Sequence, residues 1–201
     1  MYEIIQGNSI SEIKLGLIGE RKVGKTSILY SYFGLKFKNN LLNKFWPKTM
    51  ETKFNSTNNQ DIQLIISDTY GAEIFYYFTI NTIKDLKGII IVFDVTSRET
   101  FDKIPEWLES VKEECSDPFI VLFGNKSDLN EKREVSIEEI NKFAKEKKLK
   151  YFEVSAHSKK GIDEGINYIA NLIYEKYLYE YFIIKPKIKK NKIKYFYVYI
   201  L

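Results

Sequence analysis

The chain has 201 residues, 44% of them hydrophobic, which suits one domain with a sizeable core and leaves too little for two full domains. Its longest apolar runs have the length of a strand, well short of the roughly 20 residues that a membrane span needs, and its first residues do not follow the order of a secretory signal. One cysteine, Cys115, cannot form an internal disulfide, so we expect a cytoplasmic protein.

The charge is uneven along the chain. Six lysines lie in a final segment, residues 185–201, that has no acidic residue, so the formal net charge of +4 becomes −2 when these six are left out. A weakly acidic body argues against nucleic acid as a partner, because phosphate backbones bind to basic faces. We therefore divide the chain into an N-terminal extension, a domain and a basic, aromatic tail, over residues 1–11, 12–184 and 185–201.

Apolar strands and amphipathic helices alternate along the domain, which is typical of a mostly parallel sheet flanked by helices. Ser136 followed by Glu139 is a capping box that opens a helix to about residue 147. Apolar residues at spacings of three and four from Ile162 predict a last helix over about 161–181. The other predicted elements are a strand near 13–19, a helix over about 26–33, a hairpin of strands near 53–57 and 62–67, and buried strands over 88–94 and 119–125.

The first strand leads directly into a glycine-rich loop, Gly19-Glu20-Arg21-Lys22-Val23-Gly24-Lys25-Thr26. In this G-x-x-x-x-G-K-T pattern backbone N–H groups surround phosphates, and the following helix adds the positive end of its dipole. Lys25 reaches the β and γ phosphates, and the Thr26 hydroxyl ligates Mg²⁺. The alternative, a glycine turn that only joins a strand to a helix, does not explain the Lys-Thr pair. The predicted triphosphate site also includes Arg21, Lys22, Val23, Gly24 and Ser27.

A second motif, Asn125-Lys126-Ser127-Asp128, follows the strand over 119–125 and indicates the base. The Asp128 carboxylate can accept hydrogen bonds from guanine N1–H and N2–H₂, whereas adenine would leave it desolvated and unpaired. A site built on such a required bond discriminates by about 10⁴-fold. Ser155-Ala156-His157 follows another strand and offers a backbone N–H to guanine O6. Although Asp128 alone could simply cap a turn, the motifs together predict GTP or GDP bound with Mg²⁺.

With these motifs in this order, residues 13–177 resemble the Ras superfamily of small GTPases, and its Rab and Ras branches most closely. Asp68-Thr69-Tyr70-Gly71-Ala72-Glu73 is similar to the family's D-T-A-G-Q-E, and Phe93-Asp94-Val95-Thr96 with Phe101 and Trp107 is similar to a Rab pattern. The resemblance implies an α/β fold of the P-loop small GTPase type, with a six-stranded, mostly parallel sheet flanked by five helices.

The resemblance also implies a function and a set of roles. The protein would be a monomeric GTP/GDP switch in intracellular vesicle trafficking or signalling, with effectors, exchange factors and GTPase-activating proteins binding to loops near residues 38–54 and 68–80. Mg²⁺ would be held by Thr26, Thr49 and Asp68. The catalytic set would be Lys25, Thr49 and Gly71. A ring against the guanine would come from Phe37, with Phe45 as the rival candidate.

Three residues depart from the family where GTP is hydrolysed. Ala72 stands where the family has the glutamine that positions the attacking water, and Tyr70 and Arg21 place large side chains near the γ-phosphate. We therefore expect a small GTPase with slow turnover. In a second interpretation, Arg21 acts in cis as an arginine finger and assists hydrolysis. Two other functions stay open: a GTP-locked, hydrolysis-deficient interaction module, and an ATP-dependent kinase or ATPase that shares only the P-loop.

The tail bears on membrane association. It has no cysteine for prenylation, and Tyr2 excludes N-myristoylation. Its lysines could attract an anionic leaflet at about 1 kcal/mol per lysine near the surface, with a disordered tail as the alternative. We therefore expect peripheral membrane association, if it occurs, only through this tail and without a prenylation motif.

Overall fold

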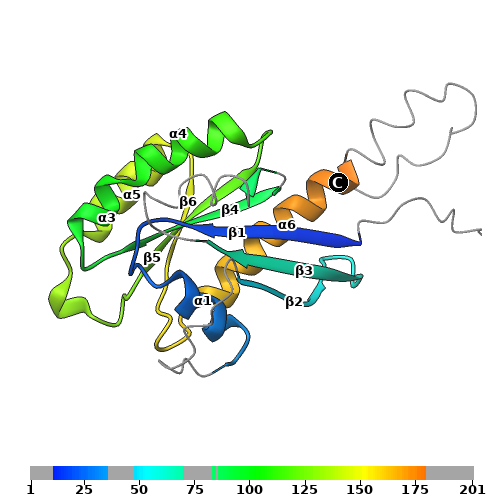
Figure 1. The fold of residues 1–201 in the computed structure, drawn as a ribbon, viewed down its shortest axis with the longest axis horizontal. Coiled ribbons are helices and arrows are strands. Elements are labelled where there is room, and N and C mark those ends of the chain that lie inside the picture. Colours follow the sequence, from blue (N-terminus) through cyan, green and yellow to red (C-terminus); the bar gives the residue numbers. More distant parts are fainter. Residues whose placement is uncertain (1–10, 36–47, 70–82, 85, 180–201) are drawn as a thin grey trace, which may run out of the picture.

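The computed structural model describes residues 11–35, 48–69, 83–84 and 86–179, which form one six-stranded sheet with helices on both faces (Figure 1). The strands, in chain order, are β1 (Glu12–Ile18), β2 (Lys48–Asn55), β3 (Asp61–Asp68), β4 (Gly88–Asp94), β5 (Phe119–Asn125) and β6 (Lys150–Glu153). The helices are α1 (Lys25–Tyr32), α3 (Arg98–Asp102), α4 (Ile104–Glu114), α5 (Ile137–Glu146) and α6 (Ile162–Tyr179). The basic tail and nearly all of the N-terminal extension lie outside the described residues.

The strand order across the sheet is β2-β3-β1-β4-β5-β6, and only the β2–β3 pair is antiparallel. The predicted α/β fold with a mostly parallel, six-stranded sheet is therefore confirmed. Strand β1 lies between β3 and β4. The chain therefore first adds β2 and β3 on one side of β1 and then adds β4, β5 and β6 on the other side. In such sheets ligands bind beyond the carboxyl ends of the strands, at the point where the order reverses. This rule directs attention to the loop after β1.

The β2–β3 hairpin confirms the predicted antiparallel pair, with one difference in length. Its turn is closed by a hydrogen bond from the Ser56 N–H to the Gln60 carbonyl, and Asn59 adopts a left-handed backbone conformation. Strand β2 begins at Lys48 rather than near residue 53, because every residue of β3 from Asp61 to Asp68 pairs with it. The extra residues are mostly polar, so their sequence carries no strand periodicity.

Two apolar cores lie on opposite faces of the sheet because successive strand residues point to opposite sides. Ile90 and Val92 of β4 pack with α1 and α6, whereas Ile89, Ile91 and Phe93 pack with α4 and α5. Figure 1 shows part of this division, with α3, α4 and α5 above the sheet and α1 below it. Strand β4 is buried along its whole length, which explains why its apolar run was enough to predict its bounds.

The helices agree with the sequence prediction where it was specific. The Ser136 hydroxyl accepts a hydrogen bond from the Glu139 N–H at 3.2 Å and caps α5, as the capping box predicts. Helix α6 begins at Ile162 and is described to Tyr179, so its predicted end near residue 181 lies outside the described residues. Within the part of the chain that the structure describes, no helix is both long and apolar enough to span a bilayer.

Candidate nucleotide-binding site

Five strands end at the carboxyl edge of the sheet, and the segments at these ends contain many of the residues selected from the sequence. The five strands are β1, β3, β4, β5 and β6. Because these five strands run in the same direction, segments more than a hundred residues apart in the chain reach one edge. The site is therefore assembled by the sheet rather than by any one stretch of sequence.

The P-loop after β1 is held in its shape by close backbone packing. Gly19 has φ 131° and Gly24 has φ 96°, both in the range that favours glycine, and Lys22 between them has φ 63°. A Cβ atom on Gly19 would lie 2.1 Å from the Val92 carbonyl oxygen, and one on Gly24 would lie 2.3 Å from Asn125 Nδ2. Tertiary contacts with β4 and β5 thus require glycine at both motif positions.

Lys25 is the buried cation of the loop, with 6% of its surface exposed. Its ammonium donates hydrogen bonds of 2.7 Å to the backbone carbonyls of Gly19 and Glu20. Burial lowers the pKa of this ammonium to about 8, while the carboxylates of Asp68 and Glu20 act in the opposite direction. Helix α1 begins here without a side-chain cap and without an acidic residue in its first turn. Its amino end can therefore receive an anion.

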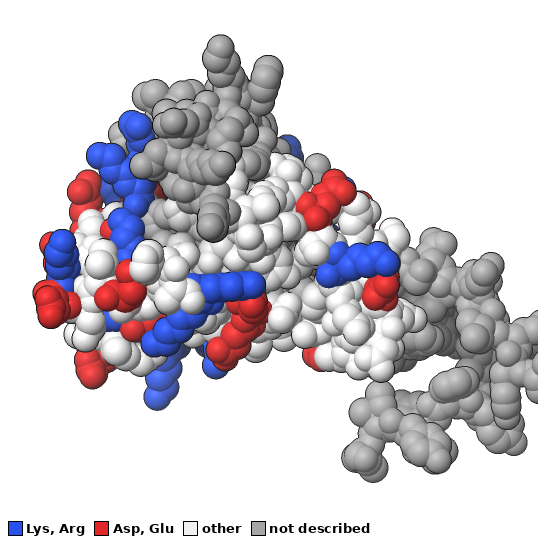
Figure 2. Space-filling view, turned by 90° about the horizontal axis from the view of Figure 1, so that it is seen from below, with Lys and Arg blue, Asp and Glu red and all other residues white. Residues whose placement is uncertain are grey.

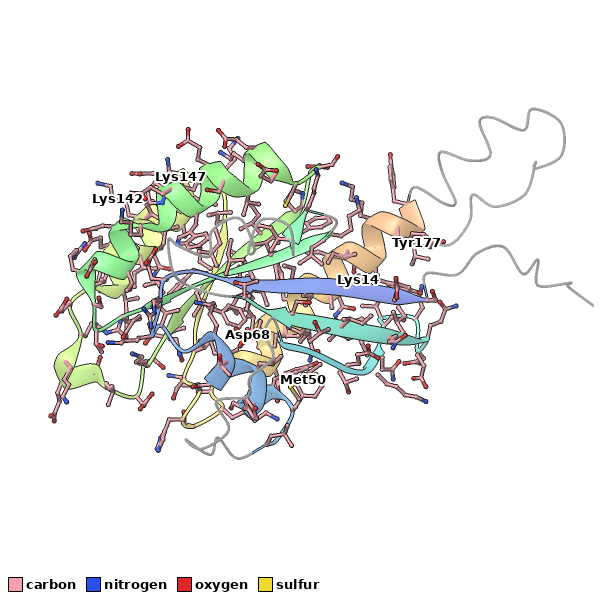
Figure 3. The ribbon with its side chains drawn as sticks, in the orientation of Figure 1. Lys14, Met50, Asp68, Lys142, Lys147 and Tyr177 are labelled. Carbon is pink, nitrogen blue, oxygen red and sulfur yellow. The ribbon has the colours of Figure 1, made fainter. Side chains whose placement is uncertain are left out.

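Thr26 and Asp68 supply the predicted oxygen ligands for Mg²⁺, and the structure brings them together. The Thr26 hydroxyl donates a 2.5 Å hydrogen bond to Asp68 Oδ2, and Asp68 is fully buried at the end of β3. Figure 3 labels Asp68 where β3 passes the start of α1. The described residues hold no group of three His, Cys, Asp or Glu side chains able to cage a metal. A hydroxyl and one carboxylate fit Mg²⁺, which usually takes few protein ligands and completes its shell with phosphates and water.

Thr49, the third predicted Mg²⁺ ligand, lies inside strand β2. It pairs in register with Ser67, and their hydroxyl oxygens are 3.3 Å apart. Its side chain is exposed at the position next to the pair that contains Asp68. The structure thus places Thr49 near Asp68 along the strands but in contact with Ser67, and its role as a metal ligand stays a prediction.

Asn125 joins the P-loop to the loop after β6. Its side chain is 1% exposed, and its amide nitrogen donates to the Val23 carbonyl at 2.8 Å. Its amide oxygen accepts from the Ala156 N–H at 3.0 Å. A buried side-chain amide with both ends bonded fixes two loops that are more than a hundred residues apart in the chain.

Asp128 and Ser155 form the other contact of the predicted base site. The Ser155 hydroxyl donates to Asp128 Oδ1 at 2.6 Å and accepts from the Ser158 N–H at 3.1 Å. Asp128 is exposed, whereas Ser155 is completely buried. A buried hydroxyl therefore orients a carboxylate at the surface, which is the arrangement needed to present an acceptor to a base.

Lys126 is held by a residue to which the sequence reasoning gave no role in the site. Its ammonium forms an ion pair with Asp94 Oδ2 at the end of β4. Asp94 Oδ1 accepts hydrogen bonds from the N–H and the hydroxyl of Thr96, at 2.9 and 2.7 Å. The available signal was an acidic residue at the end of a buried parallel strand, since such positions meet at the ligand edge.

Glu20 has a partner that sequence reasoning also missed. Trp107 of α4 donates a hydrogen bond from its indole Nε1 to Glu20 Oε1 at 3.0 Å. The two residues are 87 positions apart, and no local pattern relates them. The P-loop is therefore attached to α4 as well as to β4 and β5.

The remaining predicted residues divide into two groups. Arg21, Lys22 and His157 are exposed, and Ser27 is half-buried in the first turn of α1. The residues assigned to the base ring, the γ-phosphate sensor and the hydrolytic positions lie outside the described residues: Phe37, Phe45, Tyr70, Gly71 and Ala72.

Comparison with known proteins gives consistent matches over this part of the chain. Residues 14–175 match the family model described as Ras family. The chain is similar to the Ras-related protein Rab-4 of Dictyostelium discoideum, with 34% identity over 163 residues, or 79% of this chain and 77% of that protein. It is similar to Rab-13 of Mesocricetus auratus, with 35% identity over 162 residues (78% and 77%). It is also similar to Rab-27A of Rattus norvegicus, with 33% identity over 175 residues (82% and 79%).

The Asn125 bridge yields a prediction for stability. Asn125→Asp keeps the side-chain shape but removes the N–H that bonds to Val23, so a buried acceptor would face a carbonyl. We expect the free energy of unfolding to fall by about 2–3 kcal/mol, measured by urea denaturation without added nucleotide. The matched control is Ser127→Ala. The Ser127 hydroxyl is buried and makes no hydrogen bond with the described residues, so its loss should leave stability unchanged or raise it. Equal effects of the two variants would contradict the bridge.

Proposed function

The chain belongs to the Ras family, and from this premise we propose that it is a regulatory switch that binds GTP and GDP with Mg²⁺. The observation that carries the proposal is the pair of hydrogen bonds made by Asn125. They join the phosphate loop to the loop after β6, and a nucleotide has both a phosphate part and a base part to bind. A phosphate loop alone would bind many anions.

Guanine is the base that suits the carboxylate held at this edge. Ser155 occupies one oxygen of Asp128 and thereby orients the carboxyl group. Guanine offers two neighbouring N–H groups to such an acceptor, and adenine offers none in that arrangement. An ATP-dependent enzyme would share only the P-loop with this family, whereas the match extends over residues 14–175. We therefore rank guanine nucleotides above ATP.

Mg²⁺ would be held by Thr26 and Asp68, with the nucleotide phosphates supplying further oxygens. The ion would offset the negative charge of the phosphates. Lys25 would contribute a second positive charge, replacing its bonds to the two backbone carbonyls in whole or in part. Thr49 and Gly71 complete the proposed set, as the residues through which two loops would respond to the γ-phosphate.

The output of the switch would be binding to other proteins. The relatives named above are Ras-related Rab proteins, and on that likeness we propose a role in vesicle trafficking or signalling. Effectors, exchange factors and GTPase-activating proteins would contact the loops near residues 38–54 and 68–80. Where Figure 2 shows charged side chains, basic and acidic ones lie side by side, which does not favour a nucleic-acid surface, since such a surface would be uniformly basic.

Hydrolysis is proposed to be slow. Ala72 offers no group that could position water, and Arg21 is an exposed side chain in the P-loop itself. The alternative is a GTP-locked interaction module that keeps the fold and the nucleotide but not the turnover. Both functions use the same binding residues, so only the fate of bound GTP separates them.

The first prediction concerns the base. We expect GTP and GDP, but not ATP, to displace a fluorescent GDP analogue from the purified protein. Asp128→Ala should weaken GTP binding by about 100-fold or more, because it removes an acceptor of two charge-assisted hydrogen bonds. Glu131→Ala removes an exposed carboxylate three positions away and should leave the affinity unchanged. Displacement by ATP at the concentrations that suffice for GTP would refute guanine specificity.

The second prediction concerns turnover, measured as single-turnover conversion of bound GTP with Mg²⁺. Ala72→Gln restores a group that can orient water and should raise the rate about tenfold or more. Arg21→Ala should leave the rate unchanged or increase it, because the side chain would obstruct the site. A clear fall in the rate with Arg21→Ala would instead assign it the arginine-finger role. GTP that persists for hours in the Ala72→Gln variant would favour the locked module.

The third prediction concerns the domain boundary and the tail. We propose a nucleotide-binding domain over residues 12–184 and a basic tail over 185–201 as the only membrane contact. The full chain should sediment with anionic vesicles at low salt and stay in solution with neutral ones. Six Lys→Gln changes should abolish sedimentation, since each lysine contributes about 1 kcal/mol near the surface. The six positions are Lys185, Lys187, Lys189, Lys190, Lys192 and Lys194. A wild-type chain that ignores anionic vesicles would end this proposal.

A further inference from the structure

Trp107 contacts the phosphate loop although its helix, α4, packs on the opposite face of the sheet from α1. We propose that Trp107 is a positioning residue of the nucleotide site, and that its indole N–H holds Glu20 in place and thereby slows nucleotide release. This inference rests on the proposed guanine-nucleotide function. It adds α4 to the elements that determine how tightly the nucleotide is held.

The donor is a rigid group. Trp107 is 8% exposed and packs in the core beneath α4 and α5, with Ile18 of β1 and Phe93 of β4 in the same cluster. Helix α4 has a proline in its first turn. The backbone N–H of Trp107 donates a hydrogen bond to the Lys103 carbonyl. An indole held in this way has a fixed N–H direction, so its hydrogen bond can position a partner.

The acceptor is part of the phosphate loop at two points. The Glu20 side chain accepts from Trp107 at 3.0 Å, and the Glu20 backbone carbonyl accepts from the Lys25 ammonium at 2.7 Å. The residue is therefore bonded on one side to α4 and on the other to the lysine that would bind the phosphates. If the side chain is released, the carbonyl and the lysine lose one of their supports.

The charge of Glu20 gives the contact a second consequence. A carboxylate in a loop that binds phosphates would repel them if it turned inward. The hydrogen bond to Trp107 keeps this carboxylate directed toward α4. The same bond thus stabilises the loop and orients its one acidic side chain.

Core packing is the competing explanation for Trp107, because its ring lies in an apolar cluster. The two explanations differ in the role that they give to the indole N–H. Phenylalanine keeps a ring in the cluster but has no N–H for Glu20. A packing role predicts that replacing the indole changes stability whether or not Glu20 is present. A positioning role predicts a change in nucleotide release that requires Glu20.

The test measures the rate at which a fluorescent GDP analogue dissociates from the full chain with Mg²⁺. Trp107→Phe should accelerate dissociation about tenfold, as expected for one hydrogen bond to a charged acceptor. Glu20→Ala should accelerate dissociation, and adding Trp107→Phe to it should change nothing further.

The matched control is Glu106→Gln, which removes an exposed ion pair with Lys103 on the same helix and should leave dissociation unchanged. Dissociation from Trp107→Phe at the wild-type rate would overturn the inference. So would an equal acceleration by Trp107→Phe with and without the Glu20 carboxylate, since this would mean packing alone. If Trp107→Phe did not fold, an unchanged rate in Glu20→Ala would overturn it. A wild-type chain that fails to bind the analogue would refute the proposed function instead.

Discussion

The hydrogen bonds of the buried Asn125 amide are the constraint on which the rest of the site depends. One bond reaches the P-loop at Val23 and the other reaches Ala156 after β6. The amide also leaves no space for a side chain at position 24, so the motif asparagine requires the motif glycine. Neighbouring contacts follow from this geometry, because Ser155 then stands where it can orient Asp128.

The sheet provides the frame that makes this constraint possible. Parallel strands bring the ends of β1, β3, β4, β5 and β6 to one edge, and two apolar cores hold the sheet from both faces. Around the P-loop, β4 and β5 restrict the glycines, and α4 contacts Glu20 through Trp107. Loops placed on such a frame have little freedom left, which favours a site formed before its ligand arrives.

The residues proposed to hold the nucleotide phosphates and Mg²⁺ differ from the residues that depart from the family. The groups that suit phosphates and Mg²⁺ lie at the start of α1 and at the end of β3, where Lys25 contacts the loop backbone and Thr26 contacts Asp68. The departures from the family concern positions 70 and 72, in the loop after β3, together with Arg21 at the exposed side of the P-loop. Under the proposed function, changes at these positions would alter the fate of bound GTP and leave the contacts of Lys25, Thr26 and Asp68 in place.

Local patterns in the sequence were sufficient for the fold class, for the bounds of β4 and β5, for the cap of α5 and for the two nucleotide motifs. Each of these depends on residues close together in the chain, such as an apolar run or a fixed spacing. The tertiary structure alone decided that β2 begins at Lys48, that Asp94 pairs with Lys126 and that Trp107 bonds to Glu20. The first depends on pairing with β3, and the other two exist only once β4 and α4 have packed, so no local pattern encodes them.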